Sequence, residues 1–238
     1  METLARKVIC ALDTPDLGEA TQIVHKLQNK VGAFKIGHGL TLPHGLDVVD
    51  RLQDAGAERI FLDLKFHDIP NSVALAVAEA AKRKVWMLTL HIAGGPAMMT
   101  AAAEEAHAYG AEQAPLLMGV SVLTSIDEHM LRDYLAVTRP LEDHMVQLSR
   151  IAVDFGLDGV ICSTHEVKAI RQAIGHQGVI VTPGIRLPSG DAHDQKRVGS
   201  AMEALADGAN YLVIGRALMD SPDPDAVLEQ LGLLTPTA

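Results

Sequence analysis

Residues 59–82 read RIFLDLKFHDIPNSVALAVAEAAK and combine the two patterns that decide the fold. Arg59–Lys65 is a short run of mostly large apolar residues, which is typical of a strand covered on both faces. Pro70–Lys82 is longer and rich in alanine, and its proline stands at an early position, where a helix tolerates it. This stretch therefore predicts a buried parallel strand followed by a helix.

The same alternation repeats along the rest of the chain. We expect further strands at Val8–Asp13, Ala33–Gly37, Val85–His91, Pro115–Leu123, Gly159–Cys162, Val179–Gly184 and Tyr211–Gly215. We expect further helices at Asp16–Asn29, Leu46–Ala55, Pro96–Tyr109, Leu141–Phe155, Thr164–Ala173, Ser200–Ala206 and Asp223–Leu231. Most of these helical segments are followed closely by glycine, the usual residue after a helix end.

Eight strand–helix units account for nearly all of the 238 residues, and no Pro/Gly/Ser-rich linker divides the chain. We therefore expect residues 1–238 to form one catalytic domain of the α/β class, a single (β/α)8 TIM barrel. The alternative is an open, doubly wound sheet. The first strand ends in Ala-Leu-Asp-Thr-Pro (residues 11–15), and no glycine-rich dinucleotide fingerprint follows it, which disfavours that alternative.

Charge and composition narrow the kinds of partner. Twenty Lys and Arg against 30 Asp and Glu give a formal net charge of −10, and only 3% of the residues are aromatic. This argues against nucleic acid or an anionic membrane as a partner, because both are recognised through positive charge. It does not exclude a small anionic ligand, because net charge is a global property and a binding site is local.

The chain is expected to act in the cytoplasm. Cys10 and Cys162 each lie in an apolar run, which is typical of buried, reduced thiols. The first residues are charged and lack the apolar core of a signal peptide. The longest stretch without Asp, Glu, Lys or Arg is Val85–Ala103, and its Gly-Gly-Pro sequence divides it into two elements, so we expect no membrane span.

Charged residues stand where the predicted strands end, and the carboxyl ends of the strands carry the chemistry of such barrels. Asp63 and Lys65 are two positions apart, so in a regular strand both point to the inside of the barrel. Asp68 follows just before the turn into the helix. Buried charges are costly unless they pair, and two carboxylates beside one ammonium keep that ammonium charged. The plainer interpretation is a salt bridge that closes the barrel mouth.

A second group of residues suits an anion. Gly215 allows a ligand to approach the backbone, and Arg186 and Arg216 carry planar guanidinium groups that match phosphate oxygens. The loops after the seventh and eighth strands commonly form the phosphate site of this fold. Residues 186–199 form a long, polar loop at the same face and are expected to be an active-site lid. Solvated surface arginines and a loop without a role are the alternatives.

Taken together, these residues resemble the orotidine 5′-phosphate decarboxylase family, and its bacterial branch in particular. The resemblance rests on Asp63-x-Lys65-x-x-Asp68-Ile69-Pro70-Asn71, preceded by Lys35. It extends through Val122–Ser125, Gly156–Val160, Thr182–Arg186, Asp194-Gln195 and Ile214–Arg216, and so covers nearly the whole chain. The Asp-x-Lys-x-x-Asp element alone is less specific, because related sugar-phosphate decarboxylases and synthases share it.

The resemblance implies that the chain converts orotidine 5′-monophosphate to uridine 5′-monophosphate and CO2, the last step of de novo UMP biosynthesis, with neither cofactor nor metal. It implies catalytic roles for Lys35, Asp63, Asp68 and Lys65, with Lys65 as the proton donor to C6 of the pyrimidine. It implies substrate-binding roles for Asp13, Lys35, Asp63, Ile69, Ser72, Thr124, Ser125, Arg186, Gln195, Gly215 and Arg216. It also implies a homodimer in which Asp68, Ile69 and Ser72 reach the neighbouring subunit's active site.

Two positions depart from the usual pattern of that family. Ser72 stands where threonine is more usual; it keeps the hydroxyl group, so we expect its function to persist. His193 stands in the expected lid where a small residue is more common, which concerns lid closure and not the chemistry.

Two other functions stay open. One is a metal-dependent sugar-phosphate decarboxylase or aldolase-type synthase on the same barrel; the other is a non-catalytic phosphate-binding sensor. The sequence holds no cluster of His, Cys or Glu with metal-ligand spacing, and we expect His67, His91 and His165 to be hydrogen-bonded structural residues. A sensor has no need to bury Lys65 between two carboxylates, which disfavours the second alternative.

Overall fold

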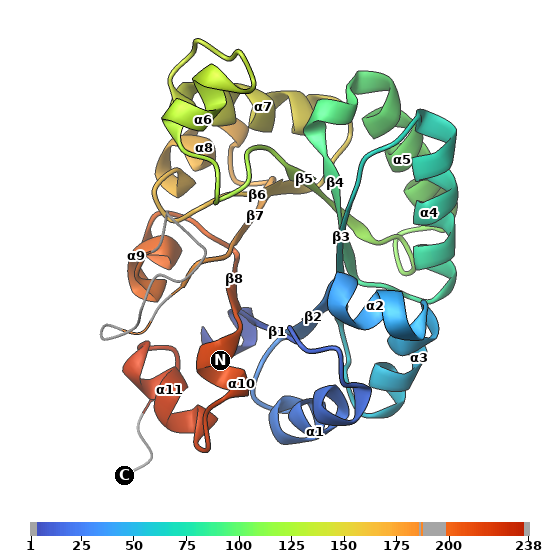
Figure 1. Ribbon diagram of the computed structural model, residues 1–238, viewed down its shortest axis with the longest axis vertical. Helices are drawn as coiled ribbons and strands as arrows, with labels where there is room; N and C mark the ends of the chain where they lie inside the picture. The colour runs from blue at the N-terminus through green and yellow to red at the C-terminus, as the bar shows by residue number, and fades with distance from the viewer. Residues whose placement is uncertain (1–3, 186, 188–198, 236–238) are drawn as a thin grey trace.

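The computed structural model describes residues 4–185, 187 and 199–235. Eight parallel strands form a closed barrel in sequence order, and β1 pairs with β8 (Figure 1). The strands are β1 (Val8–Ala11), β2 (Ala33–Ile36), β3 (Ile60–Phe66), β4 (Met87–His91), β5 (Leu116–Val120), β6 (Gly159–Ile161), β7 (Val179–Thr182) and β8 (Tyr211–Ile214). The predicted (β/α)8 barrel is therefore confirmed, and the open sheet is wrong.

Helices surround the barrel as an outer ring (Figure 1). They are α1 (Leu17–Leu27), α2 (His38–His44), α3 (Asp47–Asp54), α4 (Pro70–Lys82), α5 (Pro96–Ala108), α6 (Glu128–Asp133), α7 (Leu141–Asp154), α8 (Val167–Ile174), α9 (Ala201–Ala206), α10 (Arg216–Met219) and α11 (Pro224–Gln230). Short 3-10 helices span Leu4–Lys7 and Ile92–Gly94. In the described part of the chain, no helix combines the length and apolar character needed to cross a membrane.

Three helices were not expected from the sequence. α2 contains Pro43 and Gly39, both unfavourable inside a helix, and it forms next to the end of β2. α6 and α10 are only one to two turns long, too short for a periodic apolar pattern to be read. α6 begins at an Asp127 cap, whose side chain accepts a hydrogen bond from the amide of Met130.

The alternation of side chains along the strands divides the apolar core in two. One cluster fills the barrel interior and contains Ile9, Ala11, Ala33, Phe61, Met87, Met118, Val181 and Val213. Intervening residues such as Cys10, Leu62 and Leu88 belong to a larger cluster between the barrel and the helices. Apart from polar and charged residues such as Lys35 and Asp63, both faces of the strands are therefore apolar, which is why the strands read as nearly continuous apolar runs.

Strand β3 becomes irregular where it approaches the barrel mouth. Its register against β4 shifts between Leu62 and Phe66. Lys65 has a φ of +52°, a left-handed conformation that costs a non-glycine residue on the order of 1–3 kcal/mol. Asp63 and Lys65 still face one cavity, but through this bulge and not through the regular two-residue alternation that the sequence suggests.

Most of the strands, though not β3 and β4, end earlier than the predicted apolar runs. Asp13, Gly37, Cys162, Gly184 and Gly215 were expected to close their strands and instead lie just past the strand ends. These positions stand in the loops at the mouth of the barrel, where the regular ladder no longer constrains the backbone. Most of them line the cavity described below.

At the opposite end of the barrel, Arg171 of α8 ties together the segments that lead into β7 and β8. Its guanidinium donates hydrogen bonds to the carbonyl oxygens of Gly175, Gly178 and Gly208 and to Oδ1 of Asn210, at 2.5 to 3.1 Å. One side chain thus satisfies four acceptors that the ends of neighbouring elements leave open.

Candidate active site

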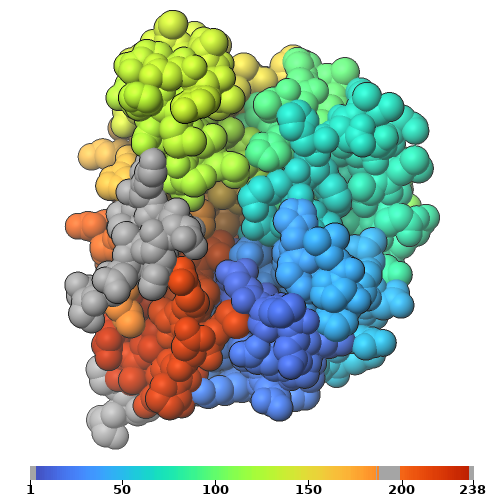
Figure 2. Space-filling model, in the orientation of Figure 1, coloured from blue at the N-terminus to red at the C-terminus, as the bar shows by residue number. Residues whose placement is uncertain are grey.

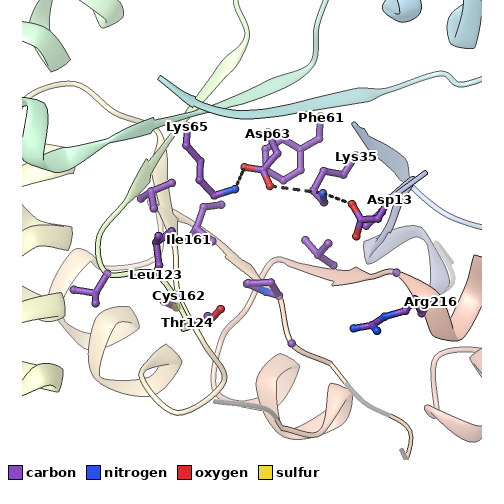
Figure 3. Close-up of a pocket in the computed structure, with 17 residues that line it drawn as sticks. Asp13, Lys35, Phe61, Asp63, Lys65, Leu123, Thr124, Ile161, Cys162 and Arg216 are labelled. Atoms are coloured by element: carbon purple, nitrogen blue, oxygen red, sulfur yellow. Dashed lines mark hydrogen bonds and ion pairs between the residues drawn. The ribbon is translucent and has the colours of Figure 1, made fainter. Parts of the chain in front are cut away.

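A cavity of about 300 Å³ opens at the carboxyl ends of the strands, and the close-up shows its lining (Figure 3). The space-filling view shows a hollow on this face, between the blue N-terminal segments and the orange-red C-terminal ones (Figure 2). The lining residues are Ala11, Asp13, Lys35, Phe61, Asp63, Lys65, Val120, Val122, Leu123, Thr124, Ile161, Cys162, Pro183, Gly184, Val213, Gly215 and Arg216. A volume of this size suits a small molecule.

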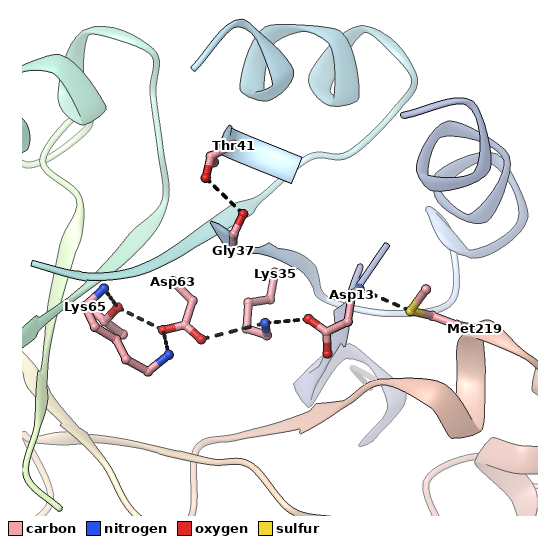
Figure 4. A network of polar contacts seen from close by, with 8 residues as sticks. Asp13, Lys35, Gly37, Thr41, Asp63, Lys65 and Met219 are labelled. Carbon is pink, nitrogen blue, oxygen red and sulfur yellow. Dashed lines mark hydrogen bonds and ion pairs between the residues drawn. The ribbon is translucent and has the colours of Figure 1, made fainter. Parts of the chain in front are cut away.

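Four lining residues form a chain of alternating charge along one wall (Figure 4). The Nζ atom of Lys35 lies 3.1 Å from Oδ1 of Asp13 and 3.7 Å from Oδ2 of Asp63. The Nζ atom of Lys65 lies 2.9 Å from Oδ1 of Asp63. Asp63 therefore stands between two ammonium groups, and Asp13 anchors the outer end of the chain.

Burial increases toward the middle of this chain. The side chains of Lys35 and Asp63 are only 12% and 15% exposed, whereas Lys65 is 34% and Asp13 is 59% exposed. Burial raises the pKa of the Asp63 carboxyl, but the Lys35 and Lys65 charges and the hydrogen bonds that Asp63 accepts outweigh it, so this pKa lies below its usual range. Asp63 is thus ionised near neutral pH.

Thr89 of β4 completes the surroundings of Asp63, and the sequence reasoning missed it. Its side chain is fully buried, and its Oγ1 donates a hydrogen bond to Oδ1 of Asp63 at 2.9 Å. The same Oγ1 accepts a hydrogen bond from the backbone amide of Lys65, also at 2.9 Å. The available signal was a single hydroxyl residue inside the otherwise apolar run before His91.

The rest of the cavity combines a cation with an apolar wall. Arg216, the first residue of α10, lines the cavity on the β8 side, and Lys65 lies on the other side (Figure 3). Gly215 lines it beside Arg216, and Thr124 adds a hydroxyl. Val120, Val122, Leu123, Ile161 and Pro183 form apolar surface between these polar groups. The lining has three basic and two acidic side chains, so it is locally positive in a chain of net charge −10.

Four residues named from the sequence lie outside this lining. Ser125 is exposed in a turn next to Thr124. Asp68 and Ile69 are exposed before α4, and Ser72 lies half-buried in its first turn. Asp68 accepts a hydrogen bond from the backbone amide of Ile69 at 2.6 Å. The chain therefore does not present Asp68, Ile69 or Ser72 to its own cavity.

A second hollow of about 320 Å³ adjoins the first and extends toward α2. It shares Asp13, Lys35, Asp63 and Lys65 with the main cavity and is otherwise lined by Leu12, Thr14, Pro15, Gly37, His38 and Gly39. The charged chain thus forms a partition that is accessible from two sides.

Some residues expected at the site are not described. Arg186, Gln195 and His193 lie outside the described residues, as does most of the expected lid at 186–199.

The three histidines near strand ends do not behave as expected. His67 and His165 are exposed, and the rings of His67 and His91 contact each other with centroids 5.4 Å apart. No hydrogen bond joins any of the three rings to another described residue, so the predicted hydrogen bonds are not found within the described part of the chain. Burial lowers the pKa of His91, and the electrostatic effects of the neighbouring His67 and Lys65 lower it further, against a smaller opposing effect of Asp63.

A closed barrel with a locally positive, partly apolar cavity at the carboxyl ends of its strands defines the class: a (β/α)8-barrel enzyme for a small anionic substrate. The model of the orotidine 5′-phosphate decarboxylase / HUMPS family matches residues 6–231. The chain belongs to this family, which confirms the resemblance seen in the sequence.

Individual relatives agree with this assignment. The chain is 44% identical over 229 residues to an orotidine 5′-phosphate decarboxylase of Syntrophotalea carbinolica, covering 95% of this chain and 93% of the relative. It is 44% identical over 224 residues to the protein of that name from Moorella thermoacetica, covering 92% and 88%. The solved orotidine 5′-phosphate decarboxylase of Lactobacillus acidophilus superimposes with a TM-score of 0.82 at 34% identity, covering 95% and 97%.

Proposed function

We propose that this chain decarboxylates orotidine 5′-monophosphate to uridine 5′-monophosphate and CO2, the last step of de novo UMP biosynthesis. The observation that carries the proposal is the Asp13–Lys35–Asp63–Lys65 chain of charges on one wall of a cavity that Arg216 lines on another side. The family and the names of the relatives support the same reaction.

The cavity suggests how the substrate lies. We assign the phosphate to Arg216 and Gly215, because a guanidinium fork and an accessible backbone suit phosphate oxygens. The ribose hydroxyls are assigned to Asp13 and Lys35, and the pyrimidine to Thr124 and the apolar wall. Arg186 and Gln195 are proposed to reach the phosphate from a lid at residues 186–199, and Ser125 to lie near the pyrimidine.

The proposed chemistry centres on Lys65. The bond between C6 and the carboxylate breaks, CO2 leaves, and the electron pair stays on C6 with no adjacent carbonyl group to accept it. The Lys65 ammonium stabilises this carbanion and then transfers a proton to C6, becoming a neutral amine. Because its side chain is 34% exposed, Lys65 can regain a proton from water. This route assigns no step to a cofactor.

Asp63 is proposed to hold Lys65 and to lie near the departing carboxylate. Two unit charges about 4 Å apart repel by about 4 kcal/mol at an effective dielectric of 20. Loss of neutral CO2 relieves that repulsion, so it favours the reaction to the extent that the relief occurs in the transition state.

We further propose a homodimer with shared active sites. The second hollow gives access to the charged chain from the α2 side, and Asp68 of the same chain does not line it. Ile69 and Leu75 are large apolar residues that are 66% and 61% exposed near the start of α4, a surface suited to burial against a second copy. In such a dimer, Asp68, Ile69 and Ser72 complete the neighbouring site.

The first experiment measures loss of orotidylate absorbance after protein is added without metal. The wild-type chain is expected to turn the substrate over, and Lys65→Ala to lower turnover at least about 10⁴-fold, because the proton donor and the stabilising charge are both lost. Lys82→Ala is the matched control: this exposed lysine pairs with Glu79 on α4, away from the cavity. Near-normal activity of folded Lys65→Ala would overturn the catalytic assignment.

The second experiment tests shared sites by mixing two inactive variants, Lys65→Ala and Asp68→Ala. A mixed dimer contains one site with both substitutions and one site with neither, so part of the activity should return. Absence of recovery, with mixed dimers demonstrated by mass spectrometry, would argue against donation of Asp68 across an interface.

The metal-dependent sugar-phosphate enzyme predicts a different result. Exhaustive chelation should leave orotidylate decarboxylation unchanged, whereas loss of the activity on chelation and its return with metal would favour that alternative. Binding of the nucleotide without turnover would favour the sensor. The proposal also places the protein in the cytoplasm, which Cys10 and Cys162 support, because both are buried and neither forms a disulfide.

A further inference from the structure

At the register shift between β3 and β4, one residue of β4 lies opposite the irregular segment of β3. Leu62 pairs with Leu88 and Phe66 pairs with Leu90, so Thr89 alone lies opposite the β3 segment from Asp63 to Lys65. Such a bulge leaves part of the bulged strand without its usual ladder partner. The hydroxyl of Thr89 supplies that partner, because it accepts the backbone N–H of Lys65 at 2.9 Å.

The same hydroxyl also reaches the acidic member of the charged pair. Its proton is donated to Oδ1 of Asp63 at 2.9 Å, and this oxygen also accepts the hydrogen bond from Nζ of Lys65 at 2.9 Å. One oxygen atom therefore connects the backbone of Lys65 to the carboxylate that holds the Lys65 ammonium. A hydroxyl can do this because it donates and accepts at once.

We infer that Thr89 is a positioning residue, which fixes the left-handed backbone of Lys65 and the carboxylate of Asp63 in the one arrangement that presents both to the cavity. Thr89 is fully buried and is absent from the cavity lining, so it acts through these two residues and not on the substrate. The inference rests on the proposed function, in which Lys65 and Asp63 perform the chemistry.

The strain at Lys65 explains why the backbone needs such support. A non-glycine residue at a φ of +52° is held there only where its surroundings over-determine the conformation. Without the hydroxyl, the Lys65 amide has lost its acceptor and Asp63 has lost a donor. Lys65 and Asp63 can then relax toward a regular strand conformation, in which the Lys65 ammonium is no longer held at its position in the cavity.

The kinetic test compares Thr89→Val with Thr89→Ser. Valine keeps the approximate shape and removes the hydroxyl, and we expect kcat to fall about 10- to 100-fold, the usual effect of losing a hydrogen bond to a charged group. KM should change by less than about threefold, because no ligand contact is lost. Serine keeps the hydroxyl and should restore kcat to within about threefold of the wild-type value.

Thr41→Val is the matched control. Thr41 is also buried, and its Oγ1 donates a hydrogen bond to the carbonyl oxygen of Gly37 at 3.0 Å, apart from the charged chain (Figure 4). Thr41→Val loses a buried hydroxyl group just as Thr89→Val does. Because this hydroxyl does not contact the charged residues, kcat of Thr41→Val should stay near the wild-type value. The inference fails if folded Thr89→Val keeps its kcat, if Thr89→Ser is as impaired as Thr89→Val, or if the whole loss is in KM.

Hydrogen exchange of the Lys65 amide provides a readout that does not depend on activity. We expect its protection factor to fall at least about tenfold in Thr89→Val and to be retained in Thr89→Ser and Thr41→Val. Unchanged protection in Thr89→Val overturns the inference even if the wild-type chain is an active decarboxylase. If the wild-type chain does not decarboxylate orotidylate, the proposed function fails, and the exchange experiment still decides whether Thr89 holds the bulge.

Discussion

Replacing Asp63 by asparagine removes the negative charge from between two ammonium groups while nearly preserving shape. Its carboxylate oxygens lie 2.9 Å from the Nζ atom of Lys65 and 3.7 Å from that of Lys35. At an effective dielectric of 20, each attraction is about 4–6 kcal/mol. The lysines regain hydration and asparagine retains an acceptor, so we expect the free energy of unfolding to fall by about 2–4 kcal/mol.

Urea denaturation at neutral pH, followed by circular dichroism, measures this loss through the midpoint and slope. Asp13→Asn is the control, because Asp13 is 59% exposed and its ion pair should contribute at most about 1 kcal/mol. An Asp63→Asn variant as stable as the wild type, or more stable, would refute the reasoning. Such a result would mean that the cost of desolvating the charged side chains around Asp63 completely offsets the attraction between them.

The contribution of Asp63 to the free energy of unfolding should also depend on pH in a definite direction. The pKa of Asp63 is lower in the folded chain than its ordinary value of 3.8, so the unfolded chain binds the proton first as the pH falls. The stabilisation is complete above the ordinary pKa and is lost as the pH falls through the folded pKa. The difference in unfolding free energy between the wild type and Asp63→Asn should therefore shrink between about pH 5 and pH 3.

Three further predictions concern the scaffold and its histidine. A Cβ added at Gly159 would lie 1.9 Å from the carbonyl oxygen of Val179, so Gly159→Ala should destabilise the fold by more than about 3 kcal/mol or abolish soluble expression. The control, Gly39→Ala, meets only ordinary contacts and should be tolerated, and equal thermal midpoints of the two variants would contradict this prediction. Arg171→Met removes the donor to several carbonyl acceptors, so the free energy of unfolding measured by urea titration should fall by about 2–4 kcal/mol. A fall of less than about 0.5 kcal/mol would show that water replaces the guanidinium as their hydrogen-bond donor. The pKa of His91 in the folded chain lies below its ordinary value of 6.5, so the neutral imidazole favours folding above about pH 6.5 and this contribution is lost as the pH falls. His91→Gln should therefore lose less stability than the wild type between about pH 7 and pH 5, and urea midpoints that change in parallel for the two proteins would contradict this prediction.

The fold could be predicted from the sequence because its dominant signals are local. Strands covered on both faces are mostly apolar, as β1 and β5 are throughout, and a proline marks the start of α4. What escaped prediction depends on contacts between distant segments. α2 forms despite Pro43 and Gly39, and the strands end where the barrel mouth opens and not where the apolar residues stop.

The charged part of the site was also visible in the sequence, because Asp63 and Lys65 are conspicuous at the end of an apolar strand. Their geometry was not. The alternation rule misses the bulge at Lys65, and nothing in the spacing pairs Thr89 with residues 24 and 26 positions away. The apolar wall was missed for another reason: residues such as Ile161 look the same in sequence whether they fill a core or face a ligand.

Closure of the barrel has a consequence for how this protein associates. Because each of the eight strands of the described barrel already has a neighbour on both sides, this barrel offers no free row of backbone N–H and C=O groups to a strand from another molecule. Docking must therefore use helix and loop side chains, such as the exposed Ile69 and Leu75. Single surface substitutions should separate association from folding, which an open-edged sheet would not allow.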